Sequence, residues 1–443
     1  MDAVAKNAAW RGTPRAGWLT LAGSVLCMLA LGAAYTWSLF NQPLAAIFHW
    51  RIEDVAFTFA LISVFLALGT LFSGWLEEKC GIRAVTAGGG LVLALGFFLA
   101  SRASALWQLY LCAGVLVGLC EGAVYMLLLT NCIKWFPRSK GLVAGIYVGS
   151  YGIGSILFKH INLALLESLG PLDTFACLAV IMALACLIAS LMIRPAPLSE
   201  EEEPSLAVRR AEPAQPASLD SSGSTAMRAG PALDSVSEVL PGRVPQHCLE
   251  DGADCPDLTW REMIRTKEAW LLFFIMLSCC MSGLFLVSVA RDLATLWAGL
   301  DTLTAAGAVT VVAVANTLGR ILLGRLSDLV PRMRIISANT LGIFLSACVL
   351  AFAPLNSFVF FLCMGVIAFG FGGTISTFPA LTGEFFGLRH MSKNYSLIYQ
   401  GFGAGAFAGS FLSVLLGGFF NTFILIMVLS LISFVITLRI RKP

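Results

Sequence analysis

The chain has 443 residues, of which 58% are hydrophobic and only 12% are charged. The charged share is about half that of an average soluble domain, and the mean hydropathy of +0.84 is too high for a water-soluble protein. The net charge of +3, with no basic stripe, argues against nucleic-acid binding, and the apolar content argues against disorder. We therefore expect an integral membrane protein.

A bilayer core about 30 Å thick is crossed by roughly 20 apolar residues in helical conformation. Twelve stretches of this kind follow one another along the chain. In the first half they cover residues 17–41, 54–76, 84–101, 106–130, 141–165 and 172–193. In the second half they cover residues 269–290, 303–326, 335–354, 357–380, 395–418 and 420–438. Their length predicts membrane-spanning helices rather than the short alternating strands of an outer-membrane barrel.

The segment between the two sets of stretches differs in composition. Residues 195–268 are rich in Pro, Ser, Ala and Glu and include an acidic run at residues 201–203. This composition predicts a largely disordered cytoplasmic linker between an N-terminal six-helix bundle (1–194) and a C-terminal one (269–443). The end of the linker, residues 258–267, can form a helix on the membrane surface. We interpret the linker as a tether, and a regulatory role is the alternative.

Lys and Arg residues gather in alternate loops, which predicts how the chain lies in the membrane. They occur in both terminal tails and in the loops after the second, fourth, eighth and tenth stretches, whereas the other loops hold far fewer. Because basic loops stay on the cytoplasmic side, both termini are predicted to be cytoplasmic.

Short motifs recur in the two halves at an offset of about 250 residues. Gly74-x-Leu76-x-Glu78 is echoed by Gly324-x-Leu326-x-Asp328, and Ile146-Tyr147-x-Gly149 by Ile398-Tyr399-x-Gly401. An internal repeat in a chain with many spans predicts a transporter whose halves rock against each other. Its substrate site is expected between the repeats, near the middle of the membrane.

The segment from Gly74 to Arg83 resembles the signature of the major facilitator superfamily, with Glu78 in place of Asp and Lys79 in place of Arg. The resemblance implies an all-α membrane protein with twelve transmembrane helices in two pseudo-symmetric six-helix bundles. It also implies a conformational latch between the bundles at the cytoplasmic helix ends. The latch candidates are Gly74, Glu78, Lys79, Arg83 and Asp328.

Three further motifs resemble a narrower family. They are Gly32-x-x-Tyr35-x-Trp37-Ser38, Asn131-x-x-Lys134-Trp135-Phe136-Pro137 and Asn316-x-x-Gly319-Arg320. Together they are similar to the oxalate/formate antiporter family, most like its bacterial pyruvate-linked members, and more distantly to monocarboxylate carriers. The resemblance implies a carboxylate carrier in a plasma membrane, with the bacterial inner membrane favoured.

Arg320 is the leading candidate for binding the substrate. It precedes Asp328 by eight residues, or about 12 Å of helix, which places it toward the membrane interior. Its guanidinium stays charged and fits a carboxylate with two hydrogen bonds. The resemblance implies that the matching arginine of these families binds substrate. A structural arginine that pairs with helix carbonyls is the alternative.

The helix that holds Tyr399 departs from the oxalate carriers, in which a lysine follows the tyrosine. Phe402 occupies the corresponding place here. A site with one cation balances a monoanion but not a dianion, and an unpaired buried charge costs several kcal/mol. This difference favours pyruvate, formate or lactate over oxalate.

Further candidates lie within the predicted helices. Tyr35, Tyr125, Tyr151 and Tyr399 can donate hydrogen bonds to a carboxylate and pack a methyl group, or serve packing alone. Lys159 can contact substrate as a second cation or extend to the membrane surface. Glu121 is a candidate for proton coupling, and a neutral structural carboxyl is the alternative.

These observations predict a secondary active transporter of a small monocarboxylate anion that works by alternating access, as an exchanger or a proton symporter. Its expected partners are that anion, protons in the symport case and the lipid bilayer, and we expect a monomer. No enzyme activity, cofactor or metal is expected, because nucleotide-binding motifs, metal clusters and paired catalytic groups are missing from the sequence. The alternatives are an oxalate/dicarboxylate antiporter and a transporter-like membrane sensor that signals through the linker.

Overall fold

The computed structural model describes residues 14–197, 257–415 and 419–440, and these are almost entirely helical. The helices of the first half are α2 (Pro14–Leu31), η1 (Gly32–Thr36), α3 (Ser38–Phe48), α4 (Ile52–Thr70), α5 (Ser73–Cys80), α6 (Ile82–Ala100), α7 (Leu106–Leu109), η2 (Tyr110–Leu116), α8 (Val117–Trp135), α9 (Lys140–Leu169) and α10 (Pro171–Met192). Those of the second half are α12 (Trp260–Met263), α13 (Lys267–Asp292), η4 (Leu293–Trp297), α14 (Thr302–Leu326), α15 (Arg332–Phe352), α16 (Ser357–Phe386), α17 (Met391–Leu415) and α18 (Phe419–Arg439).

The helices agree segment by segment with the twelve predicted stretches. Ten helices in the described residues are long and apolar enough to cross a membrane, and α4 and α5, which are bent by 52°, make an eleventh span. Helix α17, with 25 residues, is the remaining segment. The first stretch, predicted as continuous, is broken by the 3-10 turn η1, which follows directly on α2.

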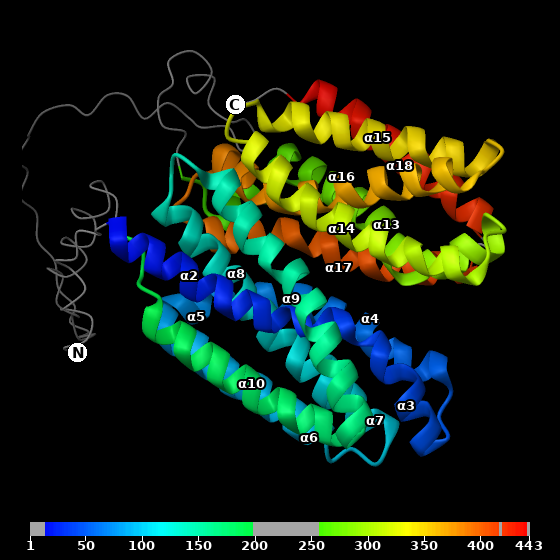
Figure 1. The fold of residues 1–443 in the computed structure, drawn as a ribbon. Helices are drawn as coiled ribbons and strands as arrows, with labels where there is room; N and C mark the ends of the chain where they lie inside the picture. Colours follow the sequence, from blue (N-terminus) through cyan, green and yellow to red (C-terminus); the bar gives the residue numbers. More distant parts are fainter. Residues whose placement is uncertain (1–13, 198–256, 416–418, 441–443) are drawn as a thin grey trace, which may run out of the picture.

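The spans form two groups with the same internal pairing. In the first group α2 packs on α9, α4 on α8 and α6 on α10. In the second group α13 packs on α17, α14 on α16 and α15 on α18. Each pair of the second group therefore repeats a pair of the first, six spans later. Figure 1 shows the first group, coloured from blue to green, beside the second, coloured from yellow-green to red.

The two bundles meet along α9, which contacts α14 and α16, and along α17, which contacts α4 and α8. Gly145 of α9 allows a close approach to α14 beside Arg320. A Cβ atom at this position would lie 2.6 Å from the carbonyl oxygen of Arg320 and 3.3 Å from the Cα atom of Gly324. Small residues let helices in membranes pack backbone to backbone. This contact brings Arg320 to the boundary between the bundles.

Helix α2 begins and α18 ends on the same side of the molecule, which we call the termini side (Figure 1). The end of the predicted linker is attached there. The backbone N–H of Leu258 donates to the carbonyl of Phe386 (3.1 Å), and the side-chain amide of Asn394 donates to the carbonyl of Leu258 (2.9 Å). The predicted surface helix is shorter than expected and comprises only α12. Residues 198–256 of the predicted linker lie outside the described residues.

Candidate functional site

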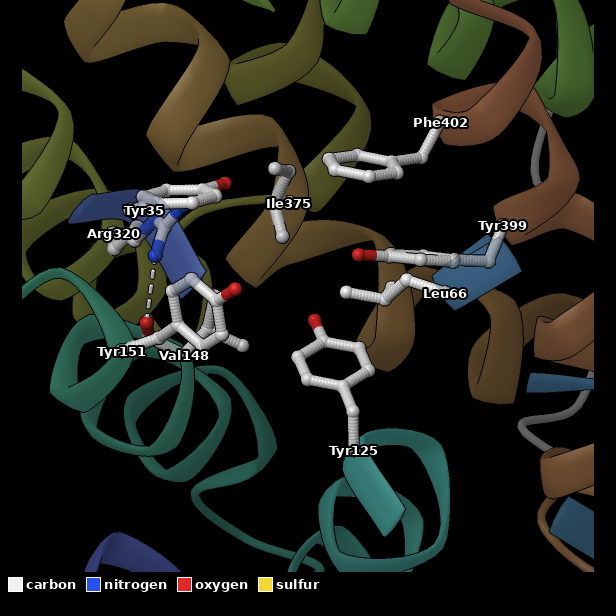
Figure 2. Close-up of a pocket in the computed structure, with 9 residues that line it drawn as sticks. All are labelled: Tyr35, Leu66, Tyr125, Val148, Tyr151, Arg320, Ile375, Tyr399 and Phe402. Atoms are coloured by element: carbon white, nitrogen blue, oxygen red, sulfur yellow. Dashed lines mark hydrogen bonds between the residues drawn. The ribbon is translucent and has the colours of Figure 1, made fainter. Parts of the chain in front are cut away.

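A small cavity lies at the boundary between the bundles. It is lined by residues from η1, α4, α8, α9, α14, α16 and α17, so both bundles contribute (Figure 2). The lining residues are Tyr35, Leu66, Tyr125, Val148, Tyr151, Arg320, Ile375, Tyr399 and Phe402. Five of them are predicted substrate-binding residues.

Arg320 is the charged residue of this lining. Its side chain is only 2% exposed, and its Nη1 donates a hydrogen bond to the carbonyl of Val148 at 2.9 Å (Figure 2). Its Nε atom is buried and has no hydrogen-bond partner among the described residues. The bond to Val148 is the kind of contact expected of a structural arginine that pairs with helix carbonyls, but it involves only part of the guanidinium. The rest is a charged donor group beside the cavity.

The four predicted tyrosines all line the cavity and form two pairs. The rings of Tyr35 and Tyr151 lie edge to face with centroids 4.6 Å apart, and Tyr35 also interacts electrostatically with Arg320. The rings of Tyr125 and Tyr399 lie 5.4 Å apart, and this contact joins α8 of one bundle to α17 of the other. Tyrosine hydroxyls are thus available near the guanidinium and across the cavity from it (Figure 2).

The remaining wall of the cavity is apolar. It consists of Leu66, Val148, Ile375 and Phe402. Phe402 is 3% exposed and stacks on Tyr399, with ring centroids 5.0 Å apart. The sequence identified Phe402 only as a place without a lysine. It did not single out Leu66, Val148 or Ile375, because apolar residues are common throughout a membrane protein and carry no signal of their own.

Glu121 lies behind the tyrosines rather than in the cavity lining. Its side chain is 1% exposed, and the hydroxyl of Tyr151 donates to its Oε1 atom at 2.6 Å. In the described part of the chain, Glu121 and Arg320 are the charged residues that are buried as whole residues. One carries a potential negative charge and belongs to the first bundle. The other carries a positive charge and belongs to the second.

Lys159 is not brought to this site. It lies on α9, two turns beyond Tyr151, and its side chain is exposed. This position agrees with the interpretation that Lys159 extends to the membrane surface. Lys159 is not a cation of the cavity. The cavity lining thus contains a single cation, which is Arg320.

The latch candidate Asp328 lies between the bundles on the termini side. Its carboxylate accepts hydrogen bonds from the backbone N–H groups of Gly141 and Leu142, both at 2.8 Å. These groups belong to the first turn of α9, where a negative charge also interacts favourably with the helix dipole. Arg332 donates to Asp328 at 3.1 Å and to Glu384, which connects α14, α15 and α16.

A second group of contacts joins α5 to α17 on the same side. Lys393 forms an ion pair with Glu78 at 2.6 Å. The Lys393 side chain lies directly over Gly74, where a Cβ atom would be 2.7 Å from its Cγ. The hydroxyls of Ser73 and Ser392 lie 2.9 Å apart. Gly74 and Glu78 are therefore contact residues between the bundles, and the sequence did not pair them with Lys393.

The structure corrects the placement of the two other latch candidates. Lys79 lies over the ring of Trp75, 4.3 Å from its centroid, on the same helix. Arg83 donates from Nε to the carbonyl of Ile193 at 2.8 Å, within the first bundle. Among the described residues, both of these contacts lie within the first bundle. A loop position reveals the side of the membrane on which a cation lies but not which bundle it contacts.

Comparison with known proteins matches the family described as Major Facilitator Superfamily over residues 22–399 and 293–443. The Escherichia coli (strain K12) uncharacterized MFS-type transporter YhjX is 39% identical over 88% of this chain and 86% of its own length. The oxalate:formate antiporter of Oxalobacter formigenes is 25% identical over 94% of this chain and 89% of its own. Human monocarboxylate transporter 2 is 27% identical over 40% of this chain and 37% of its own.

Among solved structures, the proton:xylose symporter XylE bound to 6-bromo-6-deoxy-D-glucose superposes with a TM-score of 0.67. The match covers 96% of this chain and 95% of that one, at 13% sequence identity. At this identity the likeness concerns the fold alone, and it extends over both bundles.

Proposed function

The chain belongs to the major facilitator superfamily, as its motifs predicted, and we propose that it carries a small monocarboxylate anion across the membrane by alternating access. The observation that carries this proposal is Arg320. It is the one cation in the lining of a cavity between two bundles, and its Nε atom has no hydrogen-bond partner among the described residues. A guanidinium fork binds a carboxylate better than any other side chain does.

The rest of the lining favours a substrate with one charge and a short apolar part. Ile375, Leu66 and Phe402 present hydrocarbon to the cavity, and tyrosine hydroxyls can donate to the carboxylate. The cavity is small, which favours a compact substrate. Pyruvate and lactate combine a carboxylate with a methyl group, and formate is smaller still.

Charge balance separates this proposal from that of an oxalate or dicarboxylate antiporter. A second carboxylate would lie against Phe402 and Ile375 with no cation to pair with it. An unpaired buried charge costs several kcal/mol. The relatives named as an oxalate:formate antiporter and a monocarboxylate transporter both support a carboxylate as the substrate class.

In this structure the bundles are joined on the termini side by Asp328 and by the Glu78–Lys393 pair. Inward release requires these contacts to break, so we infer that they form the latch of the transport cycle. We further propose that the termini side is cytoplasmic, that the host membrane is a bacterial inner membrane and that the carrier works as a monomer. Residues 195–268 then tether two bundles formed by residues 1–194 and 269–443.

Counterflow in liposomes of purified protein tests the proposal. The liposomes are loaded with unlabelled pyruvate, lactate, formate or oxalate, and labelled pyruvate is followed inward without a pH gradient. We expect the three monocarboxylates to accelerate entry and oxalate to have little effect. Oxalate acting best would overturn the charge argument. Failure of every anion with folded protein would favour the membrane sensor, which should also lose its output when the linker is deleted.

A further inference from the structure

Glu121 is connected to the cavity through a single hydroxyl group. The Tyr151 hydroxyl donates to Glu121 Oε1 at 2.6 Å, while the same side chain lines the cavity and packs edge to face on Tyr35. Tyr35 interacts electrostatically with both Arg320 and Glu121. Two tyrosines thus lie between the buried carboxyl and the buried guanidinium, which form no ion pair within 4.0 Å in the described residues.

The summed formal charge of Arg320, Glu121 and a bound monoanion depends on whether Glu121 is protonated. Without substrate, an ionised Glu121 offsets Arg320 and the buried site is neutral. When a monoanion binds to Arg320, an ionised Glu121 leaves one uncompensated negative charge, whereas a protonated Glu121 leaves none. Because a buried net charge costs several kcal/mol, the anion is bound most favourably together with one proton.

Other groups near Glu121 do not provide this compensation. The thiol of Cys27 on α2 and the hydroxyls of Tyr35 on η1 and Tyr151 on α9 are the titratable groups that face it from neighbouring helices. All three are neutral in the physiological pH range in their ordinary state. Glu121 is therefore the group whose charge can change when an anion enters.

Protonation of Glu121 also changes what Tyr151 can do. An ionised carboxylate only accepts hydrogen bonds, so the Tyr151 hydroxyl must point its hydrogen at Glu121. A protonated carboxyl can donate to the Tyr151 oxygen instead. The hydroxyl hydrogen is then free to turn toward the cavity and to donate to a substrate carboxylate. The proton forms one new O–H bond on Glu121, and Tyr151 keeps its own proton throughout.

We propose that Glu121 is a proton-binding site that couples the carrier to protons, with one proton bound for each monocarboxylate and Tyr151 as the positioning residue that links the two ligands. The transported load is then electrically neutral. The inference rests on the proposed transport of a monocarboxylate and assigns its mode as proton symport rather than obligatory exchange.

The test uses the full-length protein in liposomes with labelled pyruvate and a pH-sensitive dye inside. An inward proton gradient should drive accumulation, the dye should report one proton entering per pyruvate, and a membrane potential imposed alone should have no effect. In Glu121→Gln the amide imitates the protonated carboxyl. We expect this variant to retain measurable counterflow that no longer increases at lower pH, and to lose accumulation driven by the proton gradient.

The matched control is Glu167→Gln, because Glu167 is an exposed carboxylate at the end of α9. It should accumulate pyruvate as the wild type does. Wild-type counterflow without any response to the proton gradient, or full coupling in Glu121→Gln, would overturn the inference and leave the proposed carrier intact. If Glu121→Gln does not fold, the proton count and the response to potential in the wild type still decide the question. Absence of pyruvate counterflow in the wild type would instead overturn the proposed function itself.

Discussion

Arg320 of α14 donates a hydrogen bond to the backbone carbonyl of Val148 on α9, so the substrate-binding candidate of one bundle is bonded to the other bundle. The bond lies next to the glycine contact at Gly145, where the backbones of the two helices pack closely. Under the proposed alternating access, a substrate carboxylate that engages Arg320 would act at the boundary whose contacts change as the bundles rock. This gives a direct physical connection between binding and conformational change.

We expect Arg320→Lys to reduce pyruvate counterflow severely, although the charge is retained. Lysine is a point charge without the planar fork, and it cannot reach Val148 and a carboxylate at the same time. Loss of one hydrogen bond to a charged group is worth about 1.5–3 kcal/mol, or roughly a 10- to 150-fold weaker interaction. Counterflow measured against pyruvate concentration checks this. A variant with unchanged apparent affinity would show that the fork is not used.

Phe402→Lys should change the substrate preference. The new ammonium would face the cavity opposite Arg320 and supply the second cation that a dianion needs. We expect oxalate counterflow to appear and pyruvate counterflow to fall. Phe402→Leu, which keeps an apolar side chain, is the control and should retain the monocarboxylate preference. If both variants respond alike to oxalate, Phe402 has no role in charge selection.

Gly145→Ala tests the contact between α9 and α14. The added Cβ would meet backbone atoms, 2.6 Å from the Arg320 carbonyl oxygen, and backbone cannot move aside as a flexible side chain can. Overpacking of this kind costs about 1–3 kcal/mol. We expect a lower melting temperature and much slower counterflow. Gly88→Ala in α6 is the matched control, because nothing lies within 4 Å of its added Cβ. Equal behaviour of the two variants would contradict the prediction.

Asp328→Ala should loosen the first turn of α9. The carboxylate accepts from the backbone N–H groups of Gly141 and Leu142, and loss of such a cap costs about 0.5–2 kcal/mol. Hydrogen exchange at residues 140–145 should therefore be about 2- to 30-fold faster, measured by mass spectrometry. Asp173→Ala, an exposed carboxylate in the first turn of α10, should leave this segment unchanged. Unaltered exchange in Asp328→Ala would show that Asp328 does not hold the latch closed.

The sequence predicted the fold and the polar part of the cavity because their signals are local. Long apolar stretches define helices in a membrane, and Arg320 and Glu121 stand out because charged residues are rare there. The hydrogen bond between Tyr151 and Glu121 could not be predicted, since it depends on the rotation of α9 against α8. Lys79 and Arg83 were misplaced for a related reason. Their chemistry fits a latch, but packing turns them toward their own bundle.

The central claim is that Arg320 binds the substrate carboxylate. It is tested most directly by isothermal titration calorimetry of pyruvate binding to the purified wild-type protein and to Arg320→Ala. Both proteins must first show the same elution profile and comparable melting temperatures. Removing one partner of a buried charged pair costs about 2–5 kcal/mol, so we expect wild-type binding and an affinity at least about 30-fold weaker in Arg320→Ala. Equal affinities of the two folded proteins would contradict the assignment of Arg320 as the carboxylate-binding group of the cavity.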